Sequence, residues 1–206
     1  MCGRFAQPRS AEELGRIFHA RPASDVPGDR FNVAPTDEVA AVVEHHGERT
    51  VESSPAFRAS FARHRCIIPA DAFYEWRRER DPITGRTIRS EPFAVFRADG
   101  EPLALAGVWA IWRNPETAAR VYTCSILTTD PNELVARLHD RMPVVLDPAD
   151  WDAWLNESTP PTELRPMLRP APAATLDAYA VSPAVNNVRN EGAELLAPLS
   201  RWSDGV

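Results

Sequence analysis

Residues 66–76 read Cys-Ile-Ile-Pro-Ala-Asp-Ala-Phe-Tyr-Glu-Trp, the most informative internal stretch of the chain. Its end alternates as a β-strand does, with Phe73 and Glu75 on one face and Tyr74 and Trp76 on the other. Glu75 is therefore expected on a face otherwise marked by aromatic residues. Burial there would raise the pKa of its carboxyl and suit it to general acid–base catalysis. The alternative is an ion pair between Glu75 and one of the arginines at positions 77, 78 and 80.

Short helices are predicted on both sides of this stretch. Ser10-Ala-Glu-Glu13 is a capping-box pattern that starts a helix with one apolar face. A second helix is predicted over residues 55–63, where Phe57 and Phe61 are four residues apart. Asp130-Pro131 predicts a helix running toward Leu138, and Asp147-Pro148 predicts another.

Short strands fill most of the remaining chain. The apolar patterns predict strands at residues 39–43, 121–128, 144–146 and 176–181. The pair Asp99-Gly100 predicts a tight turn that joins residues 93–97 and 103–112 into a β-hairpin. Residues 77–90 form a second, charged hairpin-like excursion. This mixture of short strands and helices predicts an α+β fold.

Composition indicates one globular domain over residues 1–200, followed by a short tail at 201–206. Apolar residues make up 44% of the 206 residues and charged residues 25%. No window approaches the ~20 apolar residues of a membrane span, and no signal peptide is evident, so a cytoplasmic protein without membrane contact is expected. The net charge of −6 argues against nonspecific coating of nucleic acid, although it permits a local basic groove.

The three cysteines, Cys2, Cys66 and Cys124, are too scattered for a disulfide framework or a zinc knuckle. Cys66 and Cys124 lie in apolar runs and are expected to be buried. Cys2 directly follows Met1, and removal of Met1 would leave a thiol and a free α-amine on one residue. Such a 1,2-aminothiol can attack an aldehyde and close a thiazolidine ring. The alternative for Cys2 is a frayed terminus without a role.

His139 is expected just past the end of the predicted helix and before the strand at residues 144–146. A helix C-terminus favours a protonated histidine and hence a proton-carrying role. The competing interpretation is a structural histidine bonded to a backbone carbonyl. The pair at positions 45 and 46 lacks a third ligand at a helpful spacing, so a solvated turn is expected there and no metal site is predicted.

Five motifs, taken together, resemble one family. They are Met-Cys-Gly-Arg-Phe at residues 1–5, Phe-Asn-Val-Ala-Pro-Thr at 31–36, the stretch at 66–76, Leu-His-Asp-Arg-Met-Pro at 138–143, and the loop of Val-Ser-Pro and Asn-Asn-Val at 181–188. In this order they are similar to the SOS-response-associated peptidase (SRAP) family. The resemblance implies a single α+β domain with a β-barrel-like mixed sheet core flanked by short helices.

The resemblance also implies an activity. Proteins of this family remove their own Met1 and use Cys2 to crosslink to abasic sites in single-stranded DNA through a thiazolidine. It implies that Glu75 and His139 are catalytic together with Cys2. It further implies a monomer that needs no cofactor and associates with the nucleoid when bound to DNA. The DNA-binding positions implied by the resemblance are Arg4 and Arg141 near the DNA backbone, and Pro35 and Thr128 along the same groove.

One segment departs from the family pattern. Only six residues separate Val43 from Thr50, where the family carries a longer segment with W-G-L-V-P-x-W and I-N-A-R motifs. The family's catalytic asparagine and a DNA-contacting arginine belong to that segment. Asn32 is included among the predicted DNA-binding residues as a stand-in for that asparagine, by its chemistry and not by alignment. The shortened sheet should leave an edge strand to be covered. The alternatives are noncovalent binding of single-stranded DNA and a peptidase that uses Cys2 as its thiol nucleophile.

Overall fold

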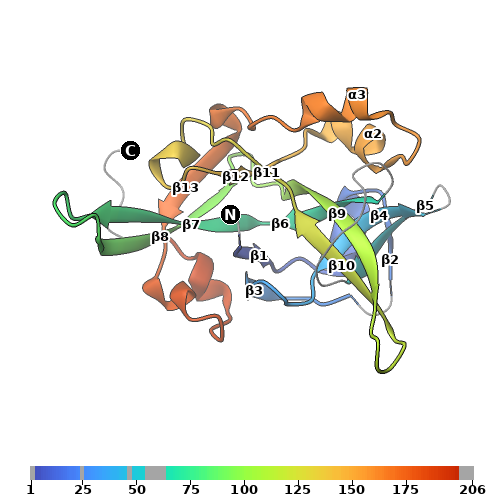
Figure 1. Cartoon of the computed structure of the whole chain (residues 1–206), viewed down its shortest axis with the longest axis horizontal. Coiled ribbons are helices and arrows are strands. Elements are labelled where there is room, and N and C mark those ends of the chain that lie inside the picture. The colour runs from blue at the N-terminus through green and yellow to red at the C-terminus, as the bar shows by residue number, and fades with distance from the viewer. Residues whose placement is uncertain (1–2, 24–25, 46–47, 54–63, 200–206) are drawn as a thin grey trace.

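The computed structural model describes residues 3–23, 26–45, 48–53 and 64–199 (Figure 1). The predicted helix over residues 55–63 and the tail at 201–206 therefore lie outside the described residues. None of the described helices is long and apolar enough to cross a membrane.

Two sheets of mainly antiparallel strands carry the fold. The first sheet has the order β13 (Leu176–Ala180), β8 (Thr87–Arg97), β7 (Ala72–Arg80), β1 (Phe5–Gln7) and β3 (Arg30–Val33). The second has the order β10 (Arg120–Ile126), β9 (Leu103–Arg113), β6 (Arg65–Ala70), β4 (Ala40–His45), β5 (Glu48–Ser53) and β2 (Arg21–Pro22). The two short strands β11 (Thr128–Thr129) and β12 (Met142–Pro143) form a separate pair.

Helical elements are short and cover the sheets. The α-helices are α1 (Ala11–Ile17), α2 (Trp151–Leu155) and α3 (Pro161–Leu164). The 3₁₀ turns are η1 (Val135–Arg137), η2 (Pro148–Asp150), η3 (Arg165–Met167), η4 (Ala173–Thr175), η5 (Pro183–Asn186) and η6 (Ala193–Leu196). The α+β prediction is confirmed, with the described strands forming two open sheets rather than a closed barrel.

The layers are held by three apolar clusters. The central cluster joins side chains of both sheets, among them Phe73 and Val95 from the first and Ile68 and Leu105 from the second. A second cluster packs the helices against the second sheet. A third packs the chain after β13 against the other face of the first sheet. Strand β7 thus has apolar layers on both faces.

The predicted capping box is present at α1. The Ser10 hydroxyl accepts a hydrogen bond from the Glu13 amide, and the Glu13 carboxylate accepts one from the Ser10 amide. The first turn therefore satisfies two amides that would otherwise lack partners, which fixes where the helix begins.

The predicted hairpin between residues 93–97 and 103–112 is wrong. Strand β8 pairs with β7 and β13, whereas β9 pairs with β6 and β10. The turn at Asp99-Gly100 exists, with φ of +80° at Gly100, but it passes the chain from one sheet to the other. The turn residues determine a local reversal of the chain, but they do not determine which strands β8 pairs with.

The predicted helix from Asp130 to Leu138 is also wrong, because only the 3₁₀ turn η1 forms. The Asn132 side chain accepts from the Val135 amide at 2.9 Å, and the turn begins at Val135, four residues after the predicted first helical position at Pro131. Asp130 instead accepts from Arg141 at 2.9 Å. A three-residue turn offers little dipole to favour a charged histidine at its end.

The short connection after β4 gives a direct β4–β5 hairpin. The pairing reaches His45 opposite Glu48, so the expected polar turn is shorter than residues 44–48. Residues 46 and 47 lie outside the described residues. The exposed edge expected there is covered by β2, which pairs with β5 in parallel, Arg21 opposite Thr50.

Candidate functional site

Glu75 lies in the middle of β7 and is 3% exposed. Its Oε1 atom is buried and has no hydrogen-bond partner among the described residues. The pKa of the Glu75 carboxyl is raised to about 7, mainly by burial and to a smaller extent by the nearby Asp140 carboxylate, while Arg78 acts in the opposite direction. At neutral pH the carboxyl is therefore close to half protonated and can both accept and donate a proton.

The described residues do not support the alternative of an ion pair at Glu75. Arg77 pairs with Glu91 at 2.6 Å, and Arg80 donates to the Gly85 carbonyl at 3.2 Å. Arg78 acts on Glu75 only as a charge at longer range. Strand alternation explains this, because Arg78 and Arg80 lie on the opposite face of β7 from Glu75.

His139 lies in the loop between η1 and β12, and its side chain is 20% exposed. Its Nδ1 accepts a hydrogen bond from the Arg141 amide at 3.1 Å. The same Nδ1 lies 2.9 Å from the Asp140 carboxylate. Nδ1 accepts from the amide when it carries no hydrogen and donates to the carboxylate when it carries one, so this ring nitrogen has a partner in either case.

The His139 loop lies close to Glu75. The Asp140 carboxylate contributes to the raised pKa of Glu75, which requires the two carboxylates to be within electrostatic range. Asp140 also contacts His139 at 2.9 Å. Asp140 therefore contacts His139 directly and lies within electrostatic range of Glu75, which puts the His139 loop in the neighbourhood of the Glu75 carboxyl.

Cys2 lies outside the described residues, but the main chain that follows it is well placed. The Tyr74 amide donates to the Arg4 carbonyl at 2.9 Å, and Phe5 pairs with Phe73 in the antiparallel β1–β7 pairing. Because the strands are antiparallel, Gly3 and Arg4 lead along β7 toward Glu75.

The other two cysteines are unsuited to act as nucleophiles. Cys66 is fully buried, and burial raises the pKa of its thiol well above the usual value. Burial also raises the pKa of the Cys124 thiol to about 11. Neither forms a thiolate near neutral pH, so Cys2 is the remaining candidate for thiol chemistry.

Arg4 and Asn32 hold the loop after β13. The Arg4 guanidinium donates to the Asn32 Oδ1 from Nε at 3.1 Å, and its Nη2 donates to Asn32 Oδ1 and to the Val185 carbonyl. The Asn32 amide nitrogen donates to the carbonyls of Asn187 and Asn190, each at 3.0 Å. Asn32 is fully buried, so its side chain positions this loop and is not placed to touch DNA.

Trp76 and Asn186 belong to the same arrangement, although sequence reasoning assigned them no role. The Trp76 indole donates to the Asn186 side chain at 2.7 Å, and the Arg4 guanidinium lies 5.9 Å from the Trp76 ring centre. Glu191 accepts from the Phe31 amide at 2.8 Å. In the sequence, the Asn-Asn-Val motif at residues 186–188 indicated this loop, but it did not indicate which residues the loop contacts.

Arg141 and Thr128 form a separate contact. The Arg141 guanidinium donates to the Thr128 carbonyl at 2.7 Å, to its hydroxyl at 3.2 Å and to Asp130 at 2.9 Å. Pro35 is exposed in the turn between Ala34 and Asp37. Among the described contacts none joins Pro35 to Arg141 or to Arg4. The predicted DNA-binding residues therefore form two groups and one separate position.

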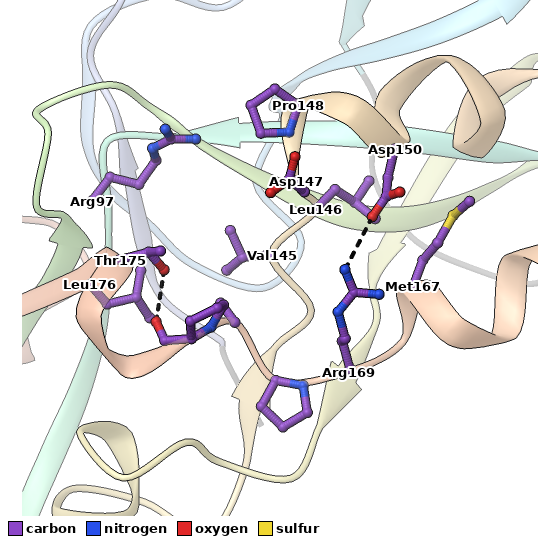
Figure 2. A pocket seen from close by; sticks show the side chains of 13 residues that line it. Arg97, Val145, Leu146, Asp147, Pro148, Asp150, Met167, Arg169, Thr175 and Leu176 are labelled. Carbon is purple, nitrogen blue, oxygen red and sulfur yellow. Dashed lines mark hydrogen bonds and ion pairs between the residues drawn. The ribbon is translucent and has the colours of Figure 1, made fainter.

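A pocket elsewhere in the chain contains none of the predicted site residues. It lies over Val145 and Leu146, between Arg97 and Arg169 (Figure 2). The Nη2 atom of Arg169 and the Oδ2 atom of Asp150, two residues that line the pocket, are 3.7 Å apart. Its cavity volume of about 140 Å³ is small beside the roughly 300–1,000 Å³ of typical ligand pockets. It is not the candidate site.

Comparison with known protein families assigns the chain to one of them. Residues 48–188 match the SOS response associated peptidase (SRAP) family, so the chain belongs to this family. The matched range includes Glu75, Thr128, His139 and Arg141.

Two curated relatives share long stretches with the chain. Abasic site processing protein YoqW of Bacillus subtilis is 41% identical over 148 residues, which cover 71% of this chain and 63% of that protein. The chain thus spans less than two thirds of that relative's length. Abasic site processing protein YedK of Escherichia coli is 28% identical over 232 aligned positions, covering 97% of this chain and 100% of that protein.

Solved structures share the fold. A protein of Bacteroides thetaiotaomicron has a TM-score of 0.75 at 20% identity, covering 88% of this chain and 93% of that one. A protein of Bordetella bronchiseptica has a TM-score of 0.69 at 26% identity, covering 88% of this chain and 100% of that one.

The alignment with YedK also contains positions that this chain lacks. It spans 232 positions, of which 97% of this 206-residue chain fills about 200, so about 32 positions have no counterpart here.

Proposed function

We propose that this protein processes abasic sites in DNA by forming a covalent thiazolidine between Cys2 and the ring-opened sugar in single-stranded DNA. Removal of Met1 exposes the Cys2 amine, which attacks the sugar aldehyde and expels one water to give an imine. The Cys2 sulfur then adds to the imine carbon, and its proton passes to the nitrogen as the ring closes. The names of the relatives as abasic site processing proteins support this substrate.

The observation that carries the proposal is the buried carboxyl of Glu75 beside the His139 loop. Imine formation requires protons to be added to and removed from the aldehyde oxygen and the Cys2 nitrogen. A carboxyl with a pKa of about 7 can perform both kinds of transfer near neutral pH. His139 can donate a proton as the closed sugar opens to its aldehyde. Removal of Met1 by the protein itself would use the same groups, with Cys2 as nucleophile.

Proton transfer is needed to open the sugar, so His139→Asn is expected to slow adduct formation by about 100-fold. The substitution keeps a small polar side chain but removes the ring nitrogen that exchanges the proton. The measurement is the rate of adduct formation with an abasic single-stranded oligonucleotide under single-turnover conditions. His19→Asn is the matched control, because His19 is exposed at the end of α1. Equal rates for the two variants would remove His139 from the mechanism.

Intact-mass measurement tests the proposal as a whole. The purified protein is expected to lack the mass of Met1, and after mixing with an abasic oligonucleotide its mass should rise by that of the oligonucleotide less one water. An oligonucleotide with an ordinary base at the same position is the control. Protein that has lost Met1 but gains no mass would refute the covalent mechanism.

The short β4–β5 connection favours one alternative. The segment that in the family carries a catalytic asparagine has no counterpart here, so the protein would bind single-stranded DNA without crosslinking to it. Salt-sensitive binding in the absence of any mass increase would support this alternative.

A further inference from the structure

Strands β7 and β8 continue beyond the first sheet as a two-stranded arm over residues 77–90, which projects from the body at the left of Figure 1. Five of these residues are arginines, at positions 77, 78, 80, 86 and 89, and two are acidic, at positions 79 and 81. The arm is thus locally basic in a chain whose net charge is −6. Such a contrast indicates a surface for one particular anionic partner.

Most of the positive charge on one face of the arm is already neutralised. Arg77 and Arg89 contact the carboxylate of Glu91 at 2.6 Å and 3.4 Å. Arg89 also lies opposite Glu79 across the two strands. This face, which follows Glu75 along β7, therefore carries ion pairs within the arm.

The other face carries Trp76 and Arg78, and Arg80 continues this row after a register shift between Glu79 and Arg80. Arg78 lies opposite Ser90, and Arg80 lies opposite Thr87, so neither arginine has a carboxylate as its cross-strand neighbour. Both arginines are exposed. The row begins at Trp76, which follows Glu75 directly in β7 and whose ring centre lies 5.9 Å from the Arg4 guanidinium, so the row starts beside the candidate site.

We propose that Arg78 and Arg80 bind phosphates of the DNA strand on one side of the abasic site, an inference that rests on the proposed function. The guanidinium fork matches the oxygens of a phosphate, and exposed arginines keep this contact dependent on salt. The four residue steps from Trp76 to Arg80 span about 14 Å at 3.4 Å per residue. A stacked strand places a phosphate about every 3.4 Å, so the row covers about four nucleotides.

The test compares Arg78→Gln/Arg80→Gln with Arg113→Gln/Arg120→Gln. Arg113 and Arg120 lie opposite each other at the end of the β9–β10 hairpin and are exposed, so the control changes the net charge by the same amount. Affinity for a single-stranded oligothymidylate is measured across a range of salt concentrations. Two lost phosphate contacts should reduce the slope of log K against log salt by about 1.4 in the first variant only.

The direction of the arm gives a second readout. Abasic oligonucleotides are prepared with two or six nucleotides on the 5′ side, or two or six on the 3′ side. Extension on one side only should speed crosslinking by the wild type at subsaturating protein, and Arg78→Gln/Arg80→Gln should lose this gain. Circular dichroism confirms that both variants are folded.

The outcomes separate this inference from the proposed function. If the wild type crosslinks but the two double variants share its salt slope and flank dependence, the arm has no DNA contact and the proposed function stands. An arm that instead binds an acidic protein would give this same result. If the wild type does not crosslink, the proposed function fails, and an unchanged salt slope in Arg78→Gln/Arg80→Gln would then overturn the arm as well.

Discussion

Replacing Cys2 with serine is expected to reduce the yield of heat-stable adduct with abasic single-stranded DNA by at least about 100-fold. The serine amine can still form an imine with the sugar aldehyde. Ring closure, however, depends on a thiol held next to that imine at a very high effective concentration, and a hydroxyl is a much weaker nucleophile. The measurement is gel analysis of the adduct after heating.

A reductant distinguishes the two steps. Borohydride should trap the imine of Cys2→Ser and restore a stable product, because the first step is intact. Cys124→Ser is the matched control, since Cys124 is half-buried and burial raises the pKa of its thiol to about 11. Loss of the adduct in Cys124→Ser but not in Cys2→Ser would place the nucleophile elsewhere.

The sequence predicts features that depend on near neighbours in the chain. Alternation in residues 72–76 predicts opposite faces for Phe73 and Tyr74, and Phe73 is found in the central cluster and Tyr74 in the third, with Glu75 buried in the same strand. The capping box of α1 is equally local, because Ser10 and Glu13 satisfy each other's amides. In both cases the physical cause lies within a few residues.

Features that depend on distant partners were missed. Arg97 and Leu103 flank a turn that resembles a hairpin turn, yet β8 finds its partners in β7 and β13. The contacts of Asn32 join residues 28 to 158 positions apart, and a sequence pattern carries no information about them. The same is true of the role of Trp76, whose indole reaches Asn186.

The candidate site combines both kinds of information. The polar identity of Glu75 and His139 is visible in the sequence, but their proximity follows from the packing of the His139 loop near β7. Asp140 was not predicted, although its carboxylate contacts His139 at 2.9 Å and raises the pKa of Glu75. Asp140 belongs to the Leu-His-Asp-Arg motif, but nothing in that motif distinguishes Asp140 from its neighbours.

Replacing Glu75 with glutamine is expected to stabilise the protein at pH 8 while slowing crosslinking by about 100-fold or more. In the folded protein burial raises the pKa of Glu75 from 4.5 to about 7. Between these values folding takes up a proton, so wild-type stability falls as pH rises from about 4.5 to about 7. At about 1.36 kcal/mol per pKa unit, the full cost above pH 7 is about 3 kcal/mol.

Glutamine cannot ionise, so the variant avoids this cost. The difference in unfolding free energy between Glu75→Gln and wild type should therefore grow by about 3 kcal/mol between pH 4 and pH 8. Urea denaturation at both pH values measures it. Any cost of fitting the amide beside the unpartnered Oε1 position is the same at both values and cancels in the comparison.

Glu79→Gln is the matched control, because Glu79 lies on the same face of β7 and is exposed. It should leave both the stability difference and the rate of crosslinking near the wild-type values. A Glu75→Gln variant whose stability relative to wild type does not change with pH would mean that Glu75 ionises normally in the folded protein. The carboxyl would then be ionised at neutral pH, and the proposed acid step would need another proton donor.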